Sequence, residues 1–229
     1  MFARLGNIAA NQLRAIKIAK ETLSLTPAGS TDWATLQNSL GIAWSDVPTG
    51  DKSENLMQAI AAYEKALAVF TKEADPVDWA SMQANLGSAW RQLLTGNKSE
   101  NLKKAITAFK AARTALSDGT HSHSEMRLAV ATNLAWVQLI TKDFAGALST
   151  AGGGSEADTL FPPLQANHAH ALLFLGRADE ARAIYLKHRG EKVDIDGTDK
   201  TWDQAILEDF DELEKNGLVN AELSKLRER

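Results

Sequence analysis

The sequence predicts an all-α protein, organised as a right-handed α-solenoid of antiparallel helical hairpins with a C-terminal capping helical segment. Two observations lead to this fold class. One long stretch of the chain occurs twice at a fixed spacing, which is typical of stacked repeat architectures. Alanine and larger apolar residues also recur at three- and four-residue spacing through most of the 229 residues, as they do in amphipathic helices.

The duplicated stretch covers residues 32–67 and 78–113, which read DWATLQNSLGIAWSDVPTGDKSENLMQAIAAYEKAL and DWASMQANLGSAWRQLLTGNKSENLKKAITAFKAAR. Every matching pair is 46 residues apart, as Trp33 is from Trp79. The residues of the first copy that recur in the second are Asp32, Trp33, Gln37, Leu40, Gly41, Trp44, Gly50, Lys52, Asn55, Ala59 and Ile60. One such unit cannot bury its apolar face alone, so neighbouring units are expected to stack.

Within each copy the pattern predicts a helical hairpin. Leu40 and Trp44 are four residues apart and therefore share a face of the first helix. Gly41 removes a side chain beside them, which lets a second helix carrying Ala59 and Tyr63 approach closely. The second copy repeats the arrangement with Leu86, Gly87, Trp90, Ala105 and Phe109. Trp44 and Trp90 are accordingly predicted to lie in the core.

Turn and capping residues mark the predicted ends of these helices. Ser53 and Ser99 are predicted to cap the second helix of each copy. Gly50, Gly96 and Gly176 are predicted to take the left-handed conformation at helix ends.

These residues carry a resemblance to the tetratricopeptide repeat family. The family signature is a Leu-Gly pair, an aromatic residue three positions later, and then alanine, an aromatic residue and alanine along the second helix. The matching residues here are Leu86, Gly87, Trp90, Ala105, Phe109 and Ala112. The standard repeat has 34 residues, so this chain resembles the long variant found in many bacterial interaction proteins.

Two later segments resemble standard-length repeats more weakly. Residues 131–148 have Ala135 in place of the glycine and Gln138 in place of the aromatic residue. Residues 165–185 have His168 and Ala169 at the positions of the Leu-Gly pair.

The predicted organisation is a repeat array over residues 1–189 followed by a C-terminal helical cap over 190–229. The array comprises an N-terminal half-repeat at 3–25, long repeats at 32–77 and 78–121, and shorter repeats at 122–155 and 160–189. Helices are predicted at 3–25, 32–47, 53–73, 77–94, 99–117, 123–141, 144–151, 159–175, 178–188, 200–216 and 219–227. The AGGGS sequence at 151–155 is interpreted as a loop between repeats or a flexible hinge, and 190–200 as a polar, turn-rich connection.

The N-terminal stretch allows more than one interpretation. Residues 1–20 contain four basic residues and no acid. A helix packed on its neighbour and a membrane-surface or transit helix both fit this pattern. The half-repeat is either a cap of the array or part of something longer.

Composition and motifs argue against several functional classes. A formal net charge of −4 gives no electrostatic basis for nucleic-acid binding. The chain has no cysteine, and the pairs His121/His123 and His168/His170 are spaced poorly for a metal site on a helix. We find no nucleophile elbow and no phosphate-binding loop. We therefore predict a non-enzyme without catalytic residues, metal or cofactor. We also expect no membrane span and a cytoplasmic location.

The resemblance implies that the concave groove of the array is the working surface. The groove positions on the first helices include Asn85, Asn133 and Asn167, which would form a ladder able to bind a peptide backbone; the alternative is that they face water. The complete set of predicted groove residues is Asn85, Arg91, Asn133, Trp136, Asn167 and His170. Trp136 is either a binding anchor or a packing residue.

The predicted function is therefore a non-catalytic scaffold that binds a protein or peptide. The alternative is a self-association or regulatory module that pairs through its N-terminal half-repeat to form a homo-oligomer, as part of a larger signalling protein. A third class, a hydrolase in the less regular C-terminal region, would require a closed polar pocket around His168, His170 and Asp194.

Overall fold

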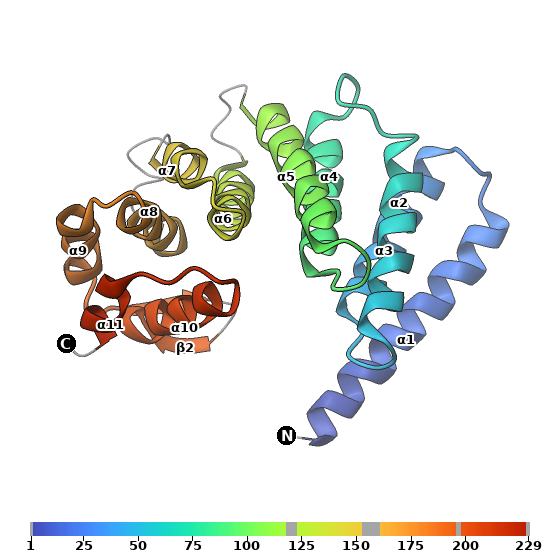
Figure 1. Ribbon diagram of the computed structural model, residues 1–229. Helices are drawn as coiled ribbons and strands as arrows, with labels where there is room; N and C mark the ends of the chain where they lie inside the picture. Colours follow the sequence, from blue (N-terminus) through green and yellow to red (C-terminus); the bar gives the residue numbers. More distant parts are fainter. Residues whose placement is uncertain (1, 118–122, 153–160, 196–197, 228–229) are drawn as a thin grey trace. The chain divides into compact units, whose positions relative to one another are not determined.

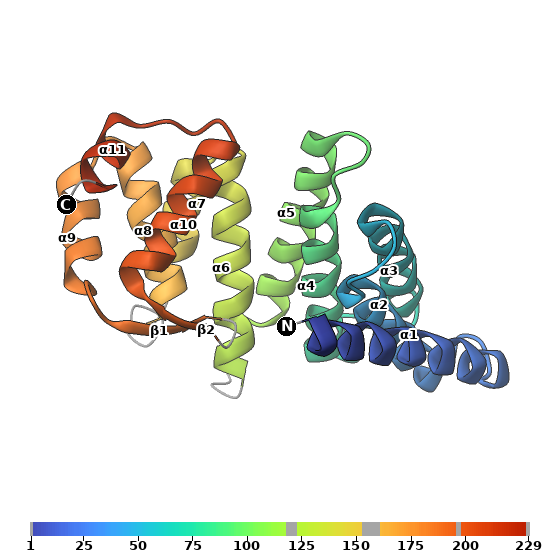
Figure 2. The ribbon, with the colours of Figure 1, turned by 90° about the horizontal axis from the view of Figure 1, so that it is seen from below.

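The computed structural model describes residues 2–117, 123–152, 161–195 and 198–227 (Figures 1 and 2). This described part is mostly helical, as predicted, with eleven helices and one two-stranded antiparallel sheet. The chain divides into two compact units, Met1–Val130 and Ala131–Arg229, which we call unit 1 and unit 2.

Unit 1 contains the duplicated stretch. Its helices are α1 (Phe2–Leu25), α2 (Thr31–Asp46), α3 (Lys52–Leu67), α4 (Pro76–Gln92), α5 (Lys98–Ala115) and the first part of α6 (Ser124–Ile140). Each of the helices α1 to α4 packs against the next one in the chain. The stripe predicted on the second helix of each copy is buried, with Ala59, Tyr63, Ala105 and Phe109 at most 2% exposed. The hairpin packing within each copy follows from this stripe.

The turn inside each copy is held by a recurring asparagine. Asn55 Nδ2 donates to the carbonyl of Thr49 (2.8 Å). Asn101 Nδ2 donates to the carbonyls of Leu93 (3.1 Å) and Thr95 (2.9 Å). Both asparagines are buried, so satisfying the backbone of the turn explains why this residue occurs in both copies.

The helix ends partly match the prediction. Gly50 and Gly96 have the expected left-handed conformation, with φ of 82° and 78°. The predicted caps at Ser53 and Ser99 are wrong. Asp51 and Asn97 cap the helices instead, accepting from the backbone N–H of the residue three positions later. The serines already lie within the first turn.

Helix α3 is shorter than the predicted 53–73, because the chain turns after Leu67 to bury Phe70. The N–H groups of Val69 and Phe70 both donate to the carbonyl of Ala66. Phe70 is 4% exposed and packs with Ala34 and Met82.

The repeated tryptophans Trp44 and Trp90 are only partly buried. Both pack against the core of unit 1, as predicted, but a lysine ammonium covers the outer part of each ring. The Nζ atom of Lys20 lies 4.9 Å from the Trp44 ring centre, and that of Lys104 lies 4.2 Å from the Trp90 ring centre. These are cation–π contacts.

Unit 2 contains the rest of α6 and a compact set of shorter elements. They are α7 (Phe144–Gly152), α8 (Pro162–Phe174), α9 (Ala178–Lys187), β1 (Lys192–Ile195), β2 (Thr198–Thr201), α10 (Trp202–Lys215) and α11 (Ala221–Arg227). Helix α10 lies beside α8 in both ribbon views (Figures 1 and 2), and the core of unit 2 joins them. The predicted cap over 190–229 is therefore packed into unit 2 through Trp202, Ile206, Phe210, Leu213, Leu218 and Leu223.

Gln138, which stands in place of the repeat aromatic, joins α6 to α7. Its Nε2 donates to Asp143 Oδ2 (3.2 Å), and its Oε1 accepts from Thr150 Oγ1 (2.7 Å). Asp143 Oδ1 also accepts from the N–H of Gly146 in the first turn of α7. Gln138 is 3% exposed, so a buried amide, joined to the buried Thr150 and to Asp143 at the surface, occupies the position that an aromatic ring fills elsewhere.

A β-hairpin replaces the connection predicted at 190–200. Strands β1 and β2 pair antiparallel, with Lys192 opposite Thr201 and Val193 opposite Lys200. The prediction of 151–155 as a loop or hinge falls mostly outside the described residues, and helix α7 ends at Gly152. None of the described helices combines the length and apolar character needed to cross a membrane.

Candidate functional site

The six predicted groove residues are divided between the two units. Asn85 and Arg91 lie on α4 in unit 1. Asn133 and Trp136 on α6, with Asn167 and His170 on α8, belong to unit 2. Two of the six residues therefore belong to unit 1 and four belong to unit 2.

Two of the predicted ladder asparagines join neighbouring helices. Asn85 Nδ2 donates to Asn38 Oδ1 (3.4 Å), which connects α4 to α2. Asn167 Nδ2 donates to the carbonyl of Thr132 (3.0 Å), which connects α8 to α6. Asn167 is 2% exposed. Its amide is thus used for packing and does not reach a ligand at the surface.

His170 is also a core residue, with 0% exposure. Its Nδ1 lies 2.8 Å from Tyr185 Oη, and its Nε2 lies 3.2 Å from Asp209 Oδ2. Burial, and secondarily the nearby Asp209 carboxylate, raise the pKa of Tyr185 well above its ordinary value. In the tautomer that carries its proton on Nε2, the ring accepts from the Tyr185 hydroxyl at Nδ1 and donates to the Asp209 carboxylate from Nε2. This network joins α8, α9 and α10, and it removes His170 from the accessible groove.

The remaining groove residues are partly buried. Trp136 packs against the core of unit 2 and meets the His170 ring edge-on, with ring centres 6.3 Å apart and planes at 69°. Asn85, Arg91, Asn133 and Trp136 keep some exposed surface. They are the predicted groove residues that a partner can contact.

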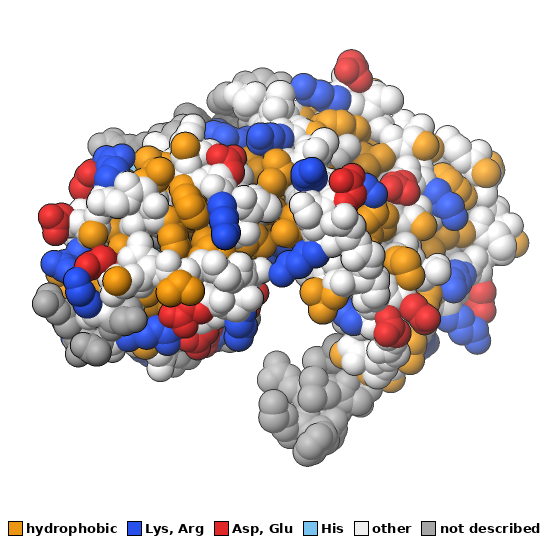
Figure 3. All heavy atoms as spheres, viewed as in Figure 1, with side chains coloured by type: hydrophobic (Ala, Val, Ile, Leu, Met, Phe, Trp, Pro, Cys, Tyr) orange, Lys and Arg blue, Asp and Glu red, His pale blue; other side chains and the backbone are white. Residues whose placement is uncertain are grey.

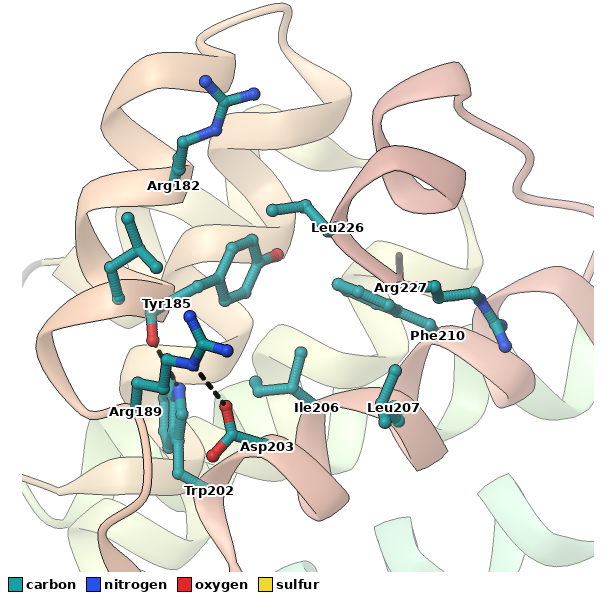
Figure 4. A pocket seen from close by; sticks show the side chains of 11 residues that line it. Arg182, Tyr185, Arg189, Trp202, Asp203, Ile206, Leu207, Phe210, Leu226 and Arg227 are labelled. Atoms are coloured by element: carbon teal, nitrogen blue, oxygen red, sulfur yellow. Dashed lines mark hydrogen bonds and ion pairs between the residues drawn. The ribbon is translucent and has the colours of Figure 1, made fainter. Parts of the chain in front are cut away.

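Unit 2 has a pocket that the sequence analysis did not single out. It has a volume of about 310 Å³ and lies between α9, α10 and α11. Figure 4 shows Tyr185, Leu226, Phe210 and Ile206 around its middle, with charged residues toward its edges. The complete lining is Arg182, Tyr185, Leu186, Arg189, Trp202, Asp203, Ile206, Leu207, Phe210, Leu226 and Arg227.

The segment before α10 fixes one wall of this pocket. Thr201 and Gln204 form a reciprocal capping box at the start of the helix. The adjacent Trp202 ring is buried, and its Nε1–H donates to the carbonyl of Tyr185 on α9 (3.0 Å). Asp203 Oδ2 accepts from the N–H of Gly190 (2.7 Å). These contacts tie both ends of the hairpin to the pocket wall.

Three arginines and one aspartate are the charged residues of the pocket lining. Arg227 Nη2 is held by Asp211 (2.7 Å) and Glu214 (3.2 Å). The other two make longer contacts, which are Arg182 with Glu222 (3.4 Å) and Asp179 (4.0 Å), and Arg189 with Asp203 (4.0 Å). Over the face of the molecule seen in Figure 3, basic and acidic side chains are interspersed. Each arginine of the lining is thus paired with at least one carboxylate, either Asp203 in the lining or an acid next to it.

Unit 1 has a shallower and larger groove of about 810 Å³ beside α3. Glu54, Met57, Ala61 and Glu64 follow one another at three- and four-residue spacing, so they share a face of α3. Met57 is 49% exposed. Across the groove are Trp90, Leu93 and Lys104, and Asp51 lies at one end of α3.

Sequence signals for both sites existed but were weak. On α3, an exposed methionine between two glutamates interrupts an otherwise polar face. On α9, Arg182 lies three residues before Tyr185 and shares its side of the helix, whereas Arg189 follows the end of the helix. Arg227, by contrast, is brought to the pocket only by tertiary folding.

The hydrolase alternative finds no support in the described geometry. His170 is enclosed by its partners, and His168 is half-buried. Burial lowers the pKa of His168, opposed by a hydrogen bond with the backbone of Ala151. The side chain of Asp194 lies outside the described residues. Within the described part, no three potential metal-ligating side chains lie together.

Comparison with known proteins adds no relative to this description. No family model matches the chain, and no curated protein is significantly similar to it.

Proposed function

We propose that the chain is a non-catalytic scaffold that binds a protein or peptide through a surface of its helical hairpins. The fold that we propose is a right-handed solenoid of tetratricopeptide type. The recurrence of hairpin packing, turn asparagines and left-handed glycines in unit 1 supports it. A bacterial origin, which only the resemblance implies, and a cytoplasmic location belong to the same proposal.

The observation that carries the proposal is the groove beside α3. Met57 is large, apolar, flexible and half exposed, which suits a contact that adapts to a partner. Glu54 and Glu64 lie on either side of it along the same face. Asp51 adds a third carboxylate, against one lysine, Lys104. This combination favours a partner segment that carries both apolar and basic side chains.

A site-specific crosslinking experiment tests this surface. A photoreactive residue at Ala61, inside the groove, is compared with one at Thr107, the equivalent exposed position of the second copy. The crosslinked partner is then produced in pure form, and its affinity is measured for the wild type and for Met57→Lys/Glu64→Lys. The control is Glu73→Lys/Glu125→Lys, which changes exposed acids that do not line the groove.

We expect crosslinking at Ala61 only, and an affinity loss of at least about tenfold for the groove variant. The control variant should bind like the wild type. Equal crosslinking at both positions, or unchanged affinity of the groove variant, would contradict the assignment.

The second candidate function is self-association through α1. Ile18 is 51% exposed and Leu25 is 86% exposed. Both lie on the face of α1 opposite Ile16 and Ala19, which pack on unit 1. Sedimentation velocity over a concentration series tests this function. A mass that rises with concentration, and that Ile18→Glu/Leu25→Glu returns to the monomer, supports pairing; a constant monomer mass rules it out.

A further inference from the structure

The middle of the unit 2 pocket is formed by apolar and aromatic side chains. Tyr185, Ile206 and Phe210 are buried in the core of unit 2 and line the pocket with their remaining surface (Figure 4). Leu186 and Leu207 also belong to the lining and are 53% and 40% exposed, so apolar surface continues from the pocket to the outside. A concave and mainly apolar surface is the usual form of a small-molecule site.

The polar atoms on the aromatic side of the pocket are already hydrogen-bonded within the protein. Tyr185 Oη lies 2.8 Å from His170 Nδ1, and Trp202 Nε1 donates to the carbonyl of Tyr185. Asp203 Oδ2 accepts from the N–H of Gly190. The hydrogen-bonding groups of these three lining side chains are thus engaged by the fold, and what they present to a ligand is mainly apolar surface.

The charges of the lining are balanced in pairs at the edges of the pocket (Figure 4). The pairs are Arg182 with Glu222 and Asp179, Arg189 with Asp203, and Arg227 with Asp211 and Glu214. The Nε atom of Arg182 has no acceptor among the described residues, but it is buried, so a ligand in the pocket does not reach it. A charged ligand would lose hydration here and find each opposite charge already paired, which is unfavourable. An uncharged ligand avoids this loss.

The volume and the aromatic lining indicate the size and shape of the ligand. An apolar cavity of about 150 Å³ binds benzene, so a pocket of about 310 Å³ has room for two fused rings. The rings of Tyr185 and Phe210 have centres 5.7 Å apart and planes at 89°. A flat aromatic ligand that stacks on one of these rings therefore meets the other edge-on, and both arrangements are favourable.

We propose that the pocket of unit 2 binds a small uncharged molecule with two fused aromatic rings. The rings lie against Tyr185, Ile206 and Phe210, and a polar substituent points past the half-exposed leucines to water. A peptide segment suits the pocket less well, because its backbone amides would need hydrogen-bonding partners that the lining has already used. The site does not depend on the groove proposed in unit 1, so either assignment can fail without the other.

A set of probes tests charge, size and peptide character separately. The reference probe is 2-naphthylmethanol, which is uncharged. The same two rings carry a negative group in 2-naphthoate and a positive group in 2-naphthylmethylamine. Benzyl alcohol has a single ring, and N-acetyltryptophanamide places a two-ring side chain on a peptide backbone. Titration followed by ¹⁵N NMR gives each Kd, with the indole N–H of Trp202 as a reporter in the pocket lining.

Two variants change the pocket and one serves as a matched control. Ile206→Trp fills the middle of the pocket, and Leu207→Asp removes an apolar lining side chain that is 40% exposed. The control is Leu175→Asp, because Leu175 is 41% exposed and lies outside the lining. Circular dichroism and thermal unfolding check the fold of each variant. If Ile206→Trp does not fold, the comparison of Leu207→Asp with Leu175→Asp decides.

We expect 2-naphthylmethanol to bind with a Kd of about 1 mM or below. Each charged analogue should bind at least about fivefold more weakly, and benzyl alcohol at least about tenfold more weakly. N-acetyltryptophanamide should bind no more tightly than the reference probe. Ile206→Trp should abolish binding, Leu207→Asp should weaken it at least about threefold, and Leu175→Asp should leave it unchanged.

Four results would overturn the proposal. Equal or tighter binding of either charged analogue would contradict an uncharged ligand, and equal binding of benzyl alcohol would contradict a ligand of two rings. Tighter binding of N-acetyltryptophanamide would assign the pocket to an aromatic side chain of a peptide. Absence of binding of 2-naphthylmethanol at up to about 2 mM, or the same affinity in Leu207→Asp and Leu175→Asp, would remove the site itself.

Discussion

The backbone of Gly41 on α2 faces the ring of Tyr63 on α3 so closely that a β-carbon at Gly41 would lie 2.5 Å from the ring. The second copy has the same relationship, since a β-carbon at Gly87 would lie 3.0 Å from the ring of Phe109. The two helices of each long copy therefore meet through a glycine and an aromatic ring.

Replacing these glycines should destabilise the two copies unequally. A methyl group at Gly41 must displace a buried ring, at a cost of about 1–3 kcal/mol, whereas alanine gains about 1 kcal/mol in helix propensity. We expect Gly41→Ala to lower the free energy of unfolding and Gly87→Ala, with its longer contact, to change it less. Urea denaturation measures both, with Ser39→Ala on the exposed face of α2 as control. Gly41→Ala at wild-type stability would show that the ring moves freely.

The chain has two tyrosines, and both should resist ionisation in the folded state. Burial raises the pKa of Tyr63 to about 12, with the Ser45 contact acting in the opposite direction and the charge of Asp46 adding to the rise. Burial, and secondarily the charge of Asp209, raise the pKa of Tyr185 well above its ordinary value. Absorbance at 295 nm should therefore show no phenolate step near pH 10 in the folded protein, and a normal step in urea.

Stability should fall over the same pH range. The folded state keeps the phenol proton more tightly than the unfolded state, so the stabilisation is complete below pH 10 and is lost as pH rises toward 12. The rise of the Tyr63 pKa from 10.0 to about 12 corresponds to about 3 kcal/mol in the free energy of unfolding. Tyr63→Phe should remove that part of the pH dependence, which denaturation at pH 9, 10 and 11 would detect. An unchanged slope would place the cause elsewhere.

Removal of the His170 ring should be among the most damaging changes in unit 2. His170→Ala leaves a cavity and deprives the buried Tyr185 hydroxyl of its partner, so we expect a loss of about 3 kcal/mol or more. Thermal unfolding of His170→Ala, Tyr185→Phe and the double variant gives their coupling energy, expected at about 1 kcal/mol or above. His168→Ala, at a half-buried position, serves as control. Additive effects would contradict a direct hydrogen bond.

The turn asparagines offer a comparison within one chain. Asn101 makes two hydrogen bonds to its turn, and Asn55 has one hydrogen bond to the equivalent position. Asn101→Ala should therefore cost about 2 kcal/mol and Asn55→Ala about 1 kcal/mol, measured by urea denaturation. The reverse order would show that the second bond of Asn101 contributes little.

The predicted concave groove can be tested separately from the α3 groove. Asn85→Ala/Asn133→Ala changes two partly exposed members of the predicted set. If the ladder binds a peptide backbone, partner affinity should fall several-fold while the thermal unfolding temperature changes by only a few degrees. Partner binding at wild-type affinity in a folded variant would reject the ladder.

Much of the secondary structure was predictable because the repeat shows each local sequence pattern twice. The Leu-Gly pair, the alanine–aromatic stripe and the turn glycines recur 46 residues apart, and the helices begin and end within a few residues of the predicted bounds. The end of α3 was mispredicted because the apolar spacing of Ala59, Tyr63 and Ala66 continues to Phe70, although the helix itself ends at Leu67. The β-hairpin was not predicted because its two strands are short and polar.

The candidate sites were harder to predict, because they depend on contacts between distant residues. His170 and Asn167 sit at positions that face the groove by analogy, yet α10 and α6 supply them with partners. No spacing in the sequence indicates that Asp209 would lie beside His170. Arg227 likewise reaches Arg182 and Arg189 only through the packing of α11.

The asparagine that closes the turn of each long copy bears on how a chain of this kind can gain further copies. Asn55 and Asn101 bond only to backbone within their own copy, and each copy also carries its own glycine and aromatic ring for joining its two helices. The turn and the helix–helix contact of one copy are therefore independent of the other copy, and we expect that insertion of a third copy in the same frame would add a hairpin without disturbing the turns already present. Duplication of this kind, followed by divergence of exposed residues such as Met57 and Lys103, would multiply recognition surfaces while leaving the hairpin framework intact.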